Sequence, residues 1–387
     1  MSSVLDFEAL ARVGLPIEHA RGLPNDHYTS EKHFAAERDS VLFQSWCGIG
    51  FGKDVAQTGE VHPVTFLGVP LVLVRDRDGQ LRVFQNVCRH RGTVLVDAPC
   101  KVPGNLIRCP YHSWSYRLDG ALAATPHIGG PGKNSDPDFD KSEFGLIEIA
   151  SHVWLDVVFV NISGTAPPFE EYAAAAIERW SEFDRPMHFC GPESAFTIDV
   201  ATNWKLAVEN YCEAYHLPFV HPGLNTYSRL EDHYDIIEEG HFSGQGTRVY
   251  RQLAGEESRR FPDFSDLSDA WATQGEYISL FPNVLLGVHR DHCFAMVLEP
   301  DGPGRTREHV ALYYANPEVG GDEWTALRER NAELWRTVFE EDIASVEGMQ
   351  RGRSGVKFDG GKFAPAMDRP THAFHQWIAR ALLAQAG

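Results

Sequence analysis

Two short loops in the N-terminal half each carry one cysteine and one histidine, and this pairing constrains the fold more than any other feature. Cys88 and His90 form the first pair, and Cys109 and His112 form the second. A zinc finger usually places both cysteines in one pair and both histidines in the other. The mixed order suits a cluster of two irons and two sulfides, in which two cysteines hold one iron and two histidines hold the other.

This is the Rieske arrangement, and its neutral imidazoles raise the reduction potential above that of an all-cysteine cluster. Ser113, Trp114 and Tyr116 lie where hydrogen-bond donors to the cluster are wanted. A structural zinc site, or chance spacing, is the alternative interpretation.

The residues around these loops predict a small antiparallel β domain over 41–162. Short segments rich in β-branched and aromatic residues alternate with turns such as Asp78-Gly79. The expected strands include Val64–Phe66, Leu71–Arg75 and Leu81–Asn86. A Pro- and Gly-rich stretch at 126–142 is expected to be a long loop.

The remainder predicts an α+β domain over 163–387, preceded in the chain by a helical segment at 1–40. Its expected strands are Phe196–Ala201, Tyr277–Val288, His292–Glu299 and His309–Asn316. Its expected helices are Glu170–Arg185, one after Asn203, Trp324–Arg351 and Thr371–Ala386.

A second group of metal-binding residue types lies in this larger domain. His216 and His221 follow Glu209 and Glu213, which stand at helical spacing. Two imidazoles and one carboxylate on one side of an iron leave positions open for small ligands. Taken alone, the two carboxylates would be read as a solvated helix face and His221 as a loop histidine; the upstream motif favours an iron site.

With both motifs in place, the chain resembles the catalytic α subunit of Rieske non-haem iron oxygenases, also called aromatic ring-hydroxylating oxygenases, over nearly its whole length. The carrying segments are NVCRHRG, CPYHSWSYRLDG, NWKLAVENYCEAYHLPFVHPG and EEDIASVEGMQRG. The resemblance implies a small antiparallel β Rieske [2Fe-2S] domain ahead of a helix-grip-like α+β catalytic domain with an antiparallel sheet, against which residues 1–40 pack.

The resemblance also implies ligands for two metal centres. The [2Fe-2S] cluster would be held by Cys88, His90, Cys109 and His112. The mononuclear Fe(II) would be held by His216, His221 and Asp342, with Glu341 and Glu347 left open as alternatives to Asp342.

Two further residues match functional positions of the family. Glu213 stands at the bridging carboxylate, which would link an iron-ligating histidine to a cluster histidine of a neighbouring subunit, and Asn210 matches an asparagine near the iron. Most members have aspartate in place of Glu213, whereas some that act on quaternary ammonium compounds have glutamate. Ser113 is a second departure, because glycine is common there.

The implied function is the terminal oxygenase component of a multicomponent system, which oxidises a small organic substrate with O2. Electrons would come from NAD(P)H through a separate reductase, with or without a ferredoxin, because the chain lacks a GxGxxG dinucleotide fingerprint. The expected assembly is a homotrimer, or an assembly with a β subunit. A Rieske electron-transfer protein without oxygenase activity is an alternative of another class.

The expected substrate is an aromatic compound, mono- or dihydroxylated on its ring. The alternative is a quaternary ammonium compound of the choline, betaine or carnitine type, oxidised beside its nitrogen. Aromatic residues expected near the substrate are Tyr211, Tyr215, Phe219, Tyr227, Tyr277, Phe281 and Phe294.

The charge balance argues against two kinds of partner. With 54 acidic and 35 basic residues the net charge is −19, which disfavours nucleic acid and anionic membrane surfaces. No apolar run approaches the roughly 20 residues of a membrane span, and the N-terminus does not resemble a signal peptide. Seven cysteines is an odd number for a disulfide framework, so the expected location is the cytoplasm.

Overall fold

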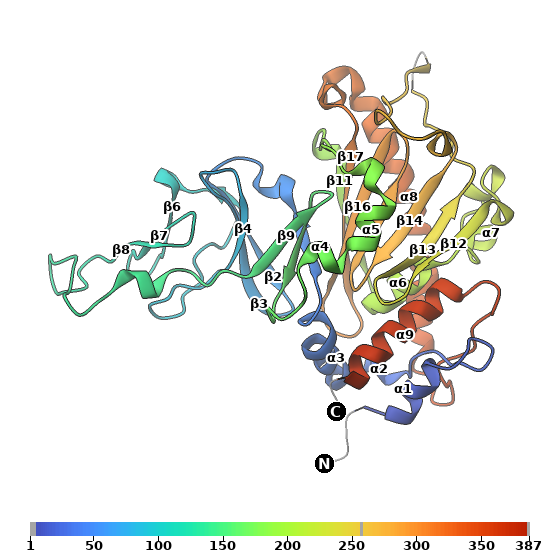
Figure 1. The fold of residues 1–387 in the computed structure, drawn as a ribbon, viewed down its shortest axis with the longest axis horizontal. Helices are drawn as coiled ribbons and strands as arrows, with labels where there is room; N and C mark the ends of the chain where they lie inside the picture. Colours follow the sequence, from blue (N-terminus) through green and yellow to red (C-terminus); the bar gives the residue numbers. More distant parts are fainter. Residues whose placement is uncertain (1–4, 256–257, 385–387) are drawn as a thin grey trace. The chain divides into compact units, whose positions relative to one another are not determined.

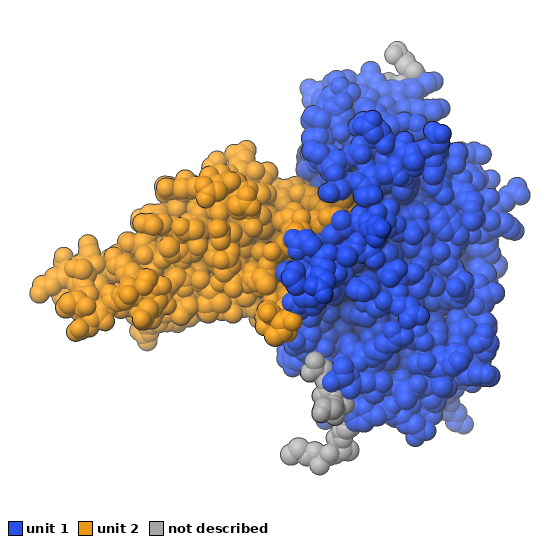
Figure 2. Space-filling view, in the orientation of Figure 1, with its two compact units in different colours: residues 1–47, 166–387 blue, residues 48–165 orange. Residues whose placement is uncertain are grey.

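The computed structural model describes residues 5–255 and 258–384, and the chain divides into two compact units (Figure 2). The first unit comprises residues 1–47 and 166–387, and the second comprises residues 48–165. Within the described ranges, no helix combines the length and the apolar character that crossing a membrane requires.

The second unit is built from short strands in three sheets, with strand orders β1-β10-β9, β4-β3-β2-β5 and β6-β7-β8 (Figure 1). The strands are β1 (Cys47–Phe51), β2 (Glu60–Phe66), β3 (Val69–Arg75), β4 (Leu81–Gln85), β5 (Cys100–Lys101), β6 (Leu106–Arg108), β7 (Ser115–Arg117), β8 (Leu122–Ala124), β9 (Ala150–Trp154) and β10 (Val157–Asn161). Hairpin pairs such as β2–β3 and β6–β7 are antiparallel. Cys88 and Cys109 are buried in its apolar core beside Phe84 and Trp114.

The first unit is organised around one seven-stranded antiparallel sheet of order β11-β17-β16-β15-β14-β13-β12. The strands are β11 (Ala195–Val200), β12 (His233–Glu238), β13 (Phe242–Thr247), β14 (Gly275–Leu280), β15 (Val284–Val288), β16 (His292–Pro300) and β17 (Thr306–Tyr314). The fold is thus the expected α+β class with an antiparallel catalytic sheet.

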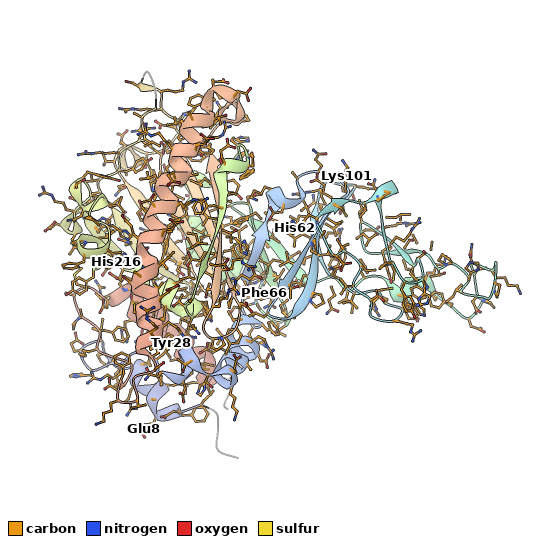
Figure 3. The ribbon with its side chains drawn as sticks, turned by 180° about the vertical axis from the view of Figure 1, so that it is seen from behind. Glu8, Tyr28, His62, Phe66, Lys101 and His216 are labelled. Carbon is orange, nitrogen blue, oxygen red and sulfur yellow. The ribbon has the colours of Figure 1, made fainter. Side chains whose placement is uncertain are left out.

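Helices cover this sheet, and three further α-helices lie in the described part of the segment before β1. They are α1 (Phe7–Val13), α2 (Asp26–Thr29), α3 (Glu31–Glu37), α4 (Phe169–Tyr172), α5 (Ala174–Arg179), α6 (Trp204–Cys212), α7 (Leu217–Val220), α8 (Thr325–Gly352) and α9 (Arg369–Ala384). Helix α6 packs on β13, β14 and β16 and also touches α8 and α9. Seen from behind, the long α8 runs across the sheet (Figure 3).

The N-terminal helices are tied to α6 and α8 by buried polar groups. Lys205 Nζ of α6 lies 2.6 Å from Glu37 Oε2 of α3, with both side chains fully buried. Gln350 of α8 donates to the carbonyl of Tyr28, which lies close to the end of α8 (Figure 3). These contacts fix the starting position of α6, the helix that leads into the iron-site histidines.

One strand prediction was wrong, and two strands were missed. The expected strand Tyr277–Val288 is the hairpin β14–β15, interrupted around Pro282, which has no N–H to donate to a ladder. Strands β12 and β13 were not predicted at all. The β13 sequence is polar and glycine-rich because a Cβ on Gly244 would meet the Tyr277 carbonyl, and one on Gly246 would meet the Tyr234 ring. Residues 385 and 386 of the expected C-terminal helix lie outside the described residues.

Candidate metal centres and substrate cavity

The two Cys-His loops of the second unit have the same backbone geometry. The carbonyl of Cys88 accepts from the N–H of Gly92, and that of Cys109 accepts from the N–H of Ser113, at 3.0 Å in both loops. The Cys88 N–H also donates to the Thr93 carbonyl, and the Cys109 N–H donates to the Trp114 carbonyl, both at 2.8 Å. Gly92 and Ser113 occupy equivalent positions, both with positive φ (74° and 58°). This explains why glycine suits the serine position.

The four side chains gather at the tips of these loops. The ring centroids of His90 and His112 lie 4.8 Å apart, and His90 stacks on Trp114 at 4.8 Å. His112 Nδ1 is buried and makes no hydrogen bond to the described residues. A buried imidazole nitrogen without a partner beside two buried thiols fits a cluster bound there.

Tyr116 supplies a hydrogen bond of the kind that tunes such a cluster. Its hydroxyl lies 3.3 Å from Cys88 Sγ and accepts from the Arg89 N–H at 2.9 Å. A cysteine sulfur that ligates a cluster is a thiolate without a proton, so the Tyr116 hydroxyl would be the donor in this contact. Burial raises the pKa of Tyr116, so the donor stays protonated. Hydrogen bonds to ligand sulfurs are one way a protein sets a cluster's potential.

In the first unit, three side chains converge on one point. His216 Nε2 lies 3.2 Å from His221 Nε2, which is 3.1 Å from Asp342 Oδ1, and the remaining edge is 3.6 Å. Ligand atoms about 2.1 Å from a metal and at right angles to one another are about 3.0 Å apart, so the triangle has the size of a two-histidine, one-carboxylate face. Asp342 Oδ1 is buried and forms no hydrogen bond with the described residues, which fits a missing positive partner.

Both histidine rings are oriented by carboxylates on their outer nitrogens. Glu213 Oε1 lies 2.7 Å from His216 Nδ1, and Glu341 Oε2 lies 2.7 Å from His221 Nδ1. These contacts select the tautomer in which each Nε2 lone pair faces inward, as carboxylate–histidine–metal units do. Burial alone would lower the pKa of His221, but Asp342 and Glu341 outweigh it and raise that pKa. The site therefore attracts positive charge.

The chain's local geometry delivers these groups. Asn203 caps α6 by accepting from the Lys205 N–H. Glu213 ends the helix with extended backbone (φ −119°, ψ 157°) and accepts from the His216 N–H through Oε2. Glu213 is therefore not on the helix with Glu209. Glu209 is buried elsewhere, where it accepts from Tyr28 and lies 3.1 Å from His375 Nε2.

The three candidate carboxylates lie in different places. Asp342 reaches the two histidines, whereas Glu341 binds the far side of the His221 ring and Glu347 accepts from the N–H of Ala201. Asn210 lines the cavity beside the three side chains.

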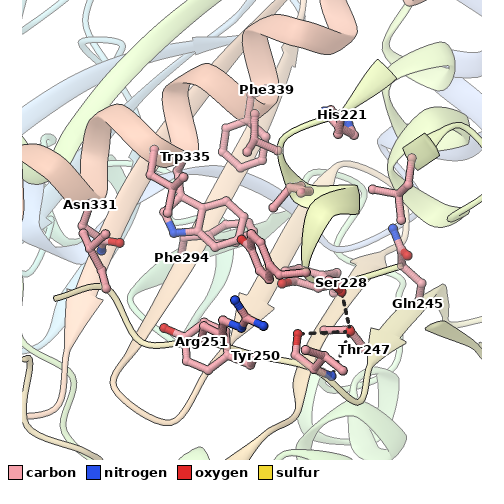
Figure 4. A pocket seen from close by; sticks show the side chains of 18 of the residues that line it. His221, Ser228, Gln245, Thr247, Tyr250, Arg251, Phe294, Asn331, Trp335 and Phe339 are labelled. Atoms are coloured by element: carbon pink, nitrogen blue, oxygen red, sulfur yellow. Dashed lines mark hydrogen bonds between the residues drawn. The ribbon is translucent and has the colours of Figure 1, made fainter. Parts of the chain in front are cut away.

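A cavity of about 500 Å³ opens from this triad (Figure 4). Among the expected aromatic residues, Tyr211, Tyr227, Tyr277 and Phe294 line it, while Tyr215 and Phe219 are exposed and Phe281 packs on Phe374 and Trp377. The sequence did not identify Tyr250, Trp335 or Phe339 as lining residues. His289 is buried and its ring contacts the Tyr277 hydroxyl, whereas His292 lines the cavity.

The polar atoms of this wall are mostly used within the protein. The hydroxyls of Tyr211, Tyr250 and Tyr277 bind the Leu286 carbonyl, Asp291 and His289, in that order. The Trp335 indole N–H donates to His292. The aromatic rings therefore present faces and edges to a ligand rather than free donors.

A second polar chain runs along one side of the cavity. Ser228 contacts both Thr247 and His233, as Figure 4 shows for Thr247. His233 in turn contacts Gln245, which donates to the carbonyl of Glu213. Burial lowers the pKa of His233, so this chain of hydrogen bonds is built on a neutral ring.

The combination of this fold and these two sites is typical of proteins with two redox centres: an iron–sulfur domain with histidine and cysteine ligands, and an α+β domain with a two-histidine, one-carboxylate iron site open to a substrate cavity. A family model for the Rieske [2Fe-2S] domain matches residues 45–133, and one for the ring hydroxylating alpha subunit (catalytic domain) matches residues 187–384. The chain belongs to the family of ring-hydroxylating α subunits.

Known relatives agree with this membership. The oxygenase subunit of carnitine monooxygenase from Acinetobacter pittii (strain PHEA-2) is 27% identical over 344 residues, which cover 87% of this chain and 86% of the relative. The chloroplastic choline monooxygenase of Arabidopsis thaliana is 26% identical over 375 residues, which cover 93% and 83%.

Solved structures share the fold. A quaternary ammonium Rieske monooxygenase in complex with L-carnitine superposes with a TM-score of 0.75 at 23% identity, covering 98% of this chain and 99% of that one. Naphthalene 1,2-dioxygenase from Rhodococcus sp. gives 0.73 at 15% identity, with 94% and 95% covered.

The chain is thus the terminal oxygenase component of a Rieske system, with a [2Fe-2S] cluster and a non-haem iron as cofactors and NAD(P)H acting through a reductase. Rieske oxygenases work with an electron-transfer partner and form multimers. The expectation of aromatic catabolism is not supported by the curated relatives, whose substrates fit the quaternary ammonium alternative.

Proposed function

We propose that this protein is a monooxygenase of a quaternary ammonium compound, which it oxidises at the carbon beside the nitrogen. The observation that carries the proposal is the aromatic-walled cavity that ends at His216, His221 and Asp342. The similarity of the chain to carnitine and choline monooxygenases supports the proposal. The glutamate at position 213, where most family members have aspartate, also supports the proposal.

The cavity wall suits a cation that cannot donate a hydrogen bond. A trimethylammonium group has no N–H, so it gains little from hydrogen-bond acceptors and is held well by aromatic faces. Trp335, Phe294 and Phe339 pack on one another along one wall, with centroids 4.5 Å apart for the first two. Among the described lining residues, Asp342 is the single carboxylate, and it faces the histidines.

The residues we assign to the two centres have defined tasks. Cys88, His90, Cys109 and His112 would hold the cluster, and His216, His221 and Asp342 would hold the iron. When bound, the cluster would supply electrons singly and the iron would supply oxygen activation at the positions its three ligands leave open. Glu213 and Glu341 hold the protons on the outer histidine nitrogens, and the aromatic wall excludes water from the substrate.

We further propose that electrons cross between copies of this chain in a ring-shaped homotrimer. His90 is exposed at the cluster loops, and Tyr111, which packs on His112, is 58% exposed. Next to Glu213, Tyr215 is 44% and Phe219 79% exposed. Exposed aromatic side chains beside both centres support docking of one copy on the next.

A relative of known structure supports the same assembly. Inter-subunit electron transfer has been described for a quaternary ammonium Rieske monooxygenase whose fold this chain shares. A separate reductase, with or without a ferredoxin, would deliver the electrons; an added β subunit is the other possible assembly.

Coupled oxygen uptake tests the substrate assignment. The purified chain with a Rieske reductase and NADH is given trimethylammonium compounds and aromatic acids in parallel, with product identified by mass spectrometry. We expect turnover of trimethylammonium compounds with release of an oxidised or cleaved product. Turnover of aromatic acids alone would overturn the assignment in favour of ring hydroxylation.

Metal analysis tests the site assignment independently. The intact protein should contain about three irons and two acid-labile sulfides per chain. His216→Ala should lose one iron and keep the cluster's visible absorbance. Loss of both centres, or of neither, would contradict two separate sites.

A further inference from the structure

We infer that the substrate carries a carboxylate at the end remote from its ammonium group, and that Arg251 recognises it. The inference rests on the proposed function and narrows it, because the related monooxygenases act on compounds with such a group, carnitine, and without one, choline.

Helix α8 gives the cavity a length scale. Its lining residues lie on one face from Asp342 through Phe339 and Trp335 to Arg330. At 1.5 Å rise per residue, the Cα of Trp335 lies about 10 Å along the axis from that of Asp342, and the Cα of Arg330 about 18 Å. The cavity therefore has an iron-site end and a distal end.

The segment 249–254 lines the distal end of the cavity. Its position is fixed at two levels of α8. Tyr250 donates to Asp291, whose neighbour His292 accepts from Trp335, and Arg330 donates to the carbonyl of Ala254 at 2.8 Å. Arg251 thus stands between the levels of Trp335 and Arg330, roughly 10 to 18 Å from Asp342 along the helix.

Arg251 is a cation available to a ligand. Arg251 is exposed, its guanidinium lies over the Tyr227 ring at 5.3 Å, and it forms no hydrogen bond or ion pair with the described residues. Figure 4 shows this side chain among those that surround the cavity. The hydroxyls of Tyr211, Tyr250 and Tyr277 and the indole N–H of Trp335 are already engaged, so the charged guanidinium is the strongest donor left for a ligand there.

The charged residues around the cavity favour a substrate whose carboxylate lies at the distal end. In a chain of net charge −19, both charged side chains at the distal end, Arg251 and Arg330, are positive. A zwitterion would place its ammonium among the aromatic rings near Asp342 and its carboxylate at Arg251, where a guanidinium can bind both oxygens. A neutral or purely cationic tail would leave the guanidinium without a partner.

Matched substrates and variants test the inference. The substrates are γ-butyrobetaine and its carboxamide, which have the same length and differ in the charge of the tail. Wild type should prefer the carboxylate. Arg251→Gln should raise KM for the carboxylate by about 10- to 100-fold with kcat little changed, and should leave KM for the amide unchanged. Arg251→Lys should recover part of the loss.

Arg248→Gln is the control variant, because its guanidinium lies over Tyr234 at 4.8 Å and does not line the cavity; it should keep both KM values. The inference is overturned if wild type uses acid and amide equally well, or if Arg251→Gln changes both substrates alike or neither. Absence of turnover of every trimethylammonium compound by wild type would instead mean that the proposed function itself fails.

Discussion

Both carboxylate oxygens of Glu213 contact His216. One carboxylate oxygen holds the His216 ring at 2.7 Å and the other accepts from the backbone of the same residue at 3.2 Å. Its side chain remains 14% exposed, next to exposed Tyr215. A carboxylate that orients an iron-site histidine and still reaches the surface is well placed to couple that histidine to a group outside the chain.

Glu213→Gln should therefore separate metal binding from electron transfer. The amide keeps the size and one acceptor oxygen but loses the charge, so we expect both metals to be retained and reoxidation of the cluster to slow by about 10- to 100-fold. Single-turnover absorbance of the reduced cluster, with substrate and O2 present, measures it. Wild-type rates with full iron content would remove the bridging role.

Glu308 makes a pH-dependent contribution to stability. It is buried on β17, where a small cavity of about 30 Å³ also borders Asp342 and Asn210. Burial, with the nearby Asp342, raises the pKa of Glu308 to about 8. Between the ordinary value of about 4.3 and that value the folded state binds one proton more than the unfolded state, so stability falls as pH rises through this window.

Glu308→Gln should remove that slope. The free energy of unfolding of iron-depleted protein, measured from pH 4 to pH 9 by urea titration, should decline with pH more steeply in wild type than in the variant. Iron-depleted protein is needed because a bound cation would offset the charge of Asp342. Parallel curves for the two proteins would show that Glu308 is not neutral in the fold.

At the scale of secondary-structure elements, the two cluster loops share one backbone conformation. Each closes with a residue of positive φ, Gly92 in one loop and Ser113 in the other. A Cβ added at Gly92 would meet no atom within 4 Å, so the demand for glycine there is conformational and not a matter of space. A non-glycine residue in this region costs about 1 kcal/mol or somewhat more.

Opposite substitutions in the two loops should therefore have opposite effects. Ser113→Gly should raise the stability of residues 48–165 by about 1 kcal/mol, and Gly92→Ala should lower it by about 1 to 2 kcal/mol. The urea midpoint for loss of the cluster's visible absorbance reports both. A lower midpoint for Ser113→Gly would mean that the serine side chain makes a stabilising contact that outweighs its backbone strain.

At the scale of the whole molecule, the proposed assembly predicts complementation between defective chains. Cys88→Ser would lack the cluster and His216→Ala would lack the iron, so neither variant alone should turn over substrate. In a three-membered ring that contains both variants, one of the three junctions pairs an intact cluster with an intact iron across the interface. Co-expressed, doubly tagged oligomers should therefore show about a third of wild-type oxygen uptake.

Separately purified oligomers that are combined without subunit exchange serve as the control and should stay inactive. Inactive mixed oligomers, with both tags present and the expected metal contents, would place electron transfer within one chain and contradict the proposed assembly.

The cofactor chemistry could be predicted from the amino-acid sequence alone, because few residue types bind metals and their order along the chain is informative. The mixed Cys-His pairs, the two histidines after Asn203 and the GxGxxG absence predicted the cofactors and the need for a reductase, as family membership confirms. Long periodic helices such as α8 were also predicted, within a residue or two of their ends.

The neighbours of those residues could not be predicted in this way, because they depend on how distant segments fold together. Adjacent Glu341 and Asp342 differ in role because α8 turns them to different sides of the His221 ring, and Glu209 and Glu213 separate because the helix ends between them. Strand propensity did not predict β13, because its glycines are required by close contacts with neighbouring backbone and rings and not by a preference for strands. The proposed role of Arg251 in binding a substrate carboxylate could likewise not be predicted from the sequence. It depends on α8 and the segment 249–254 lining the same cavity.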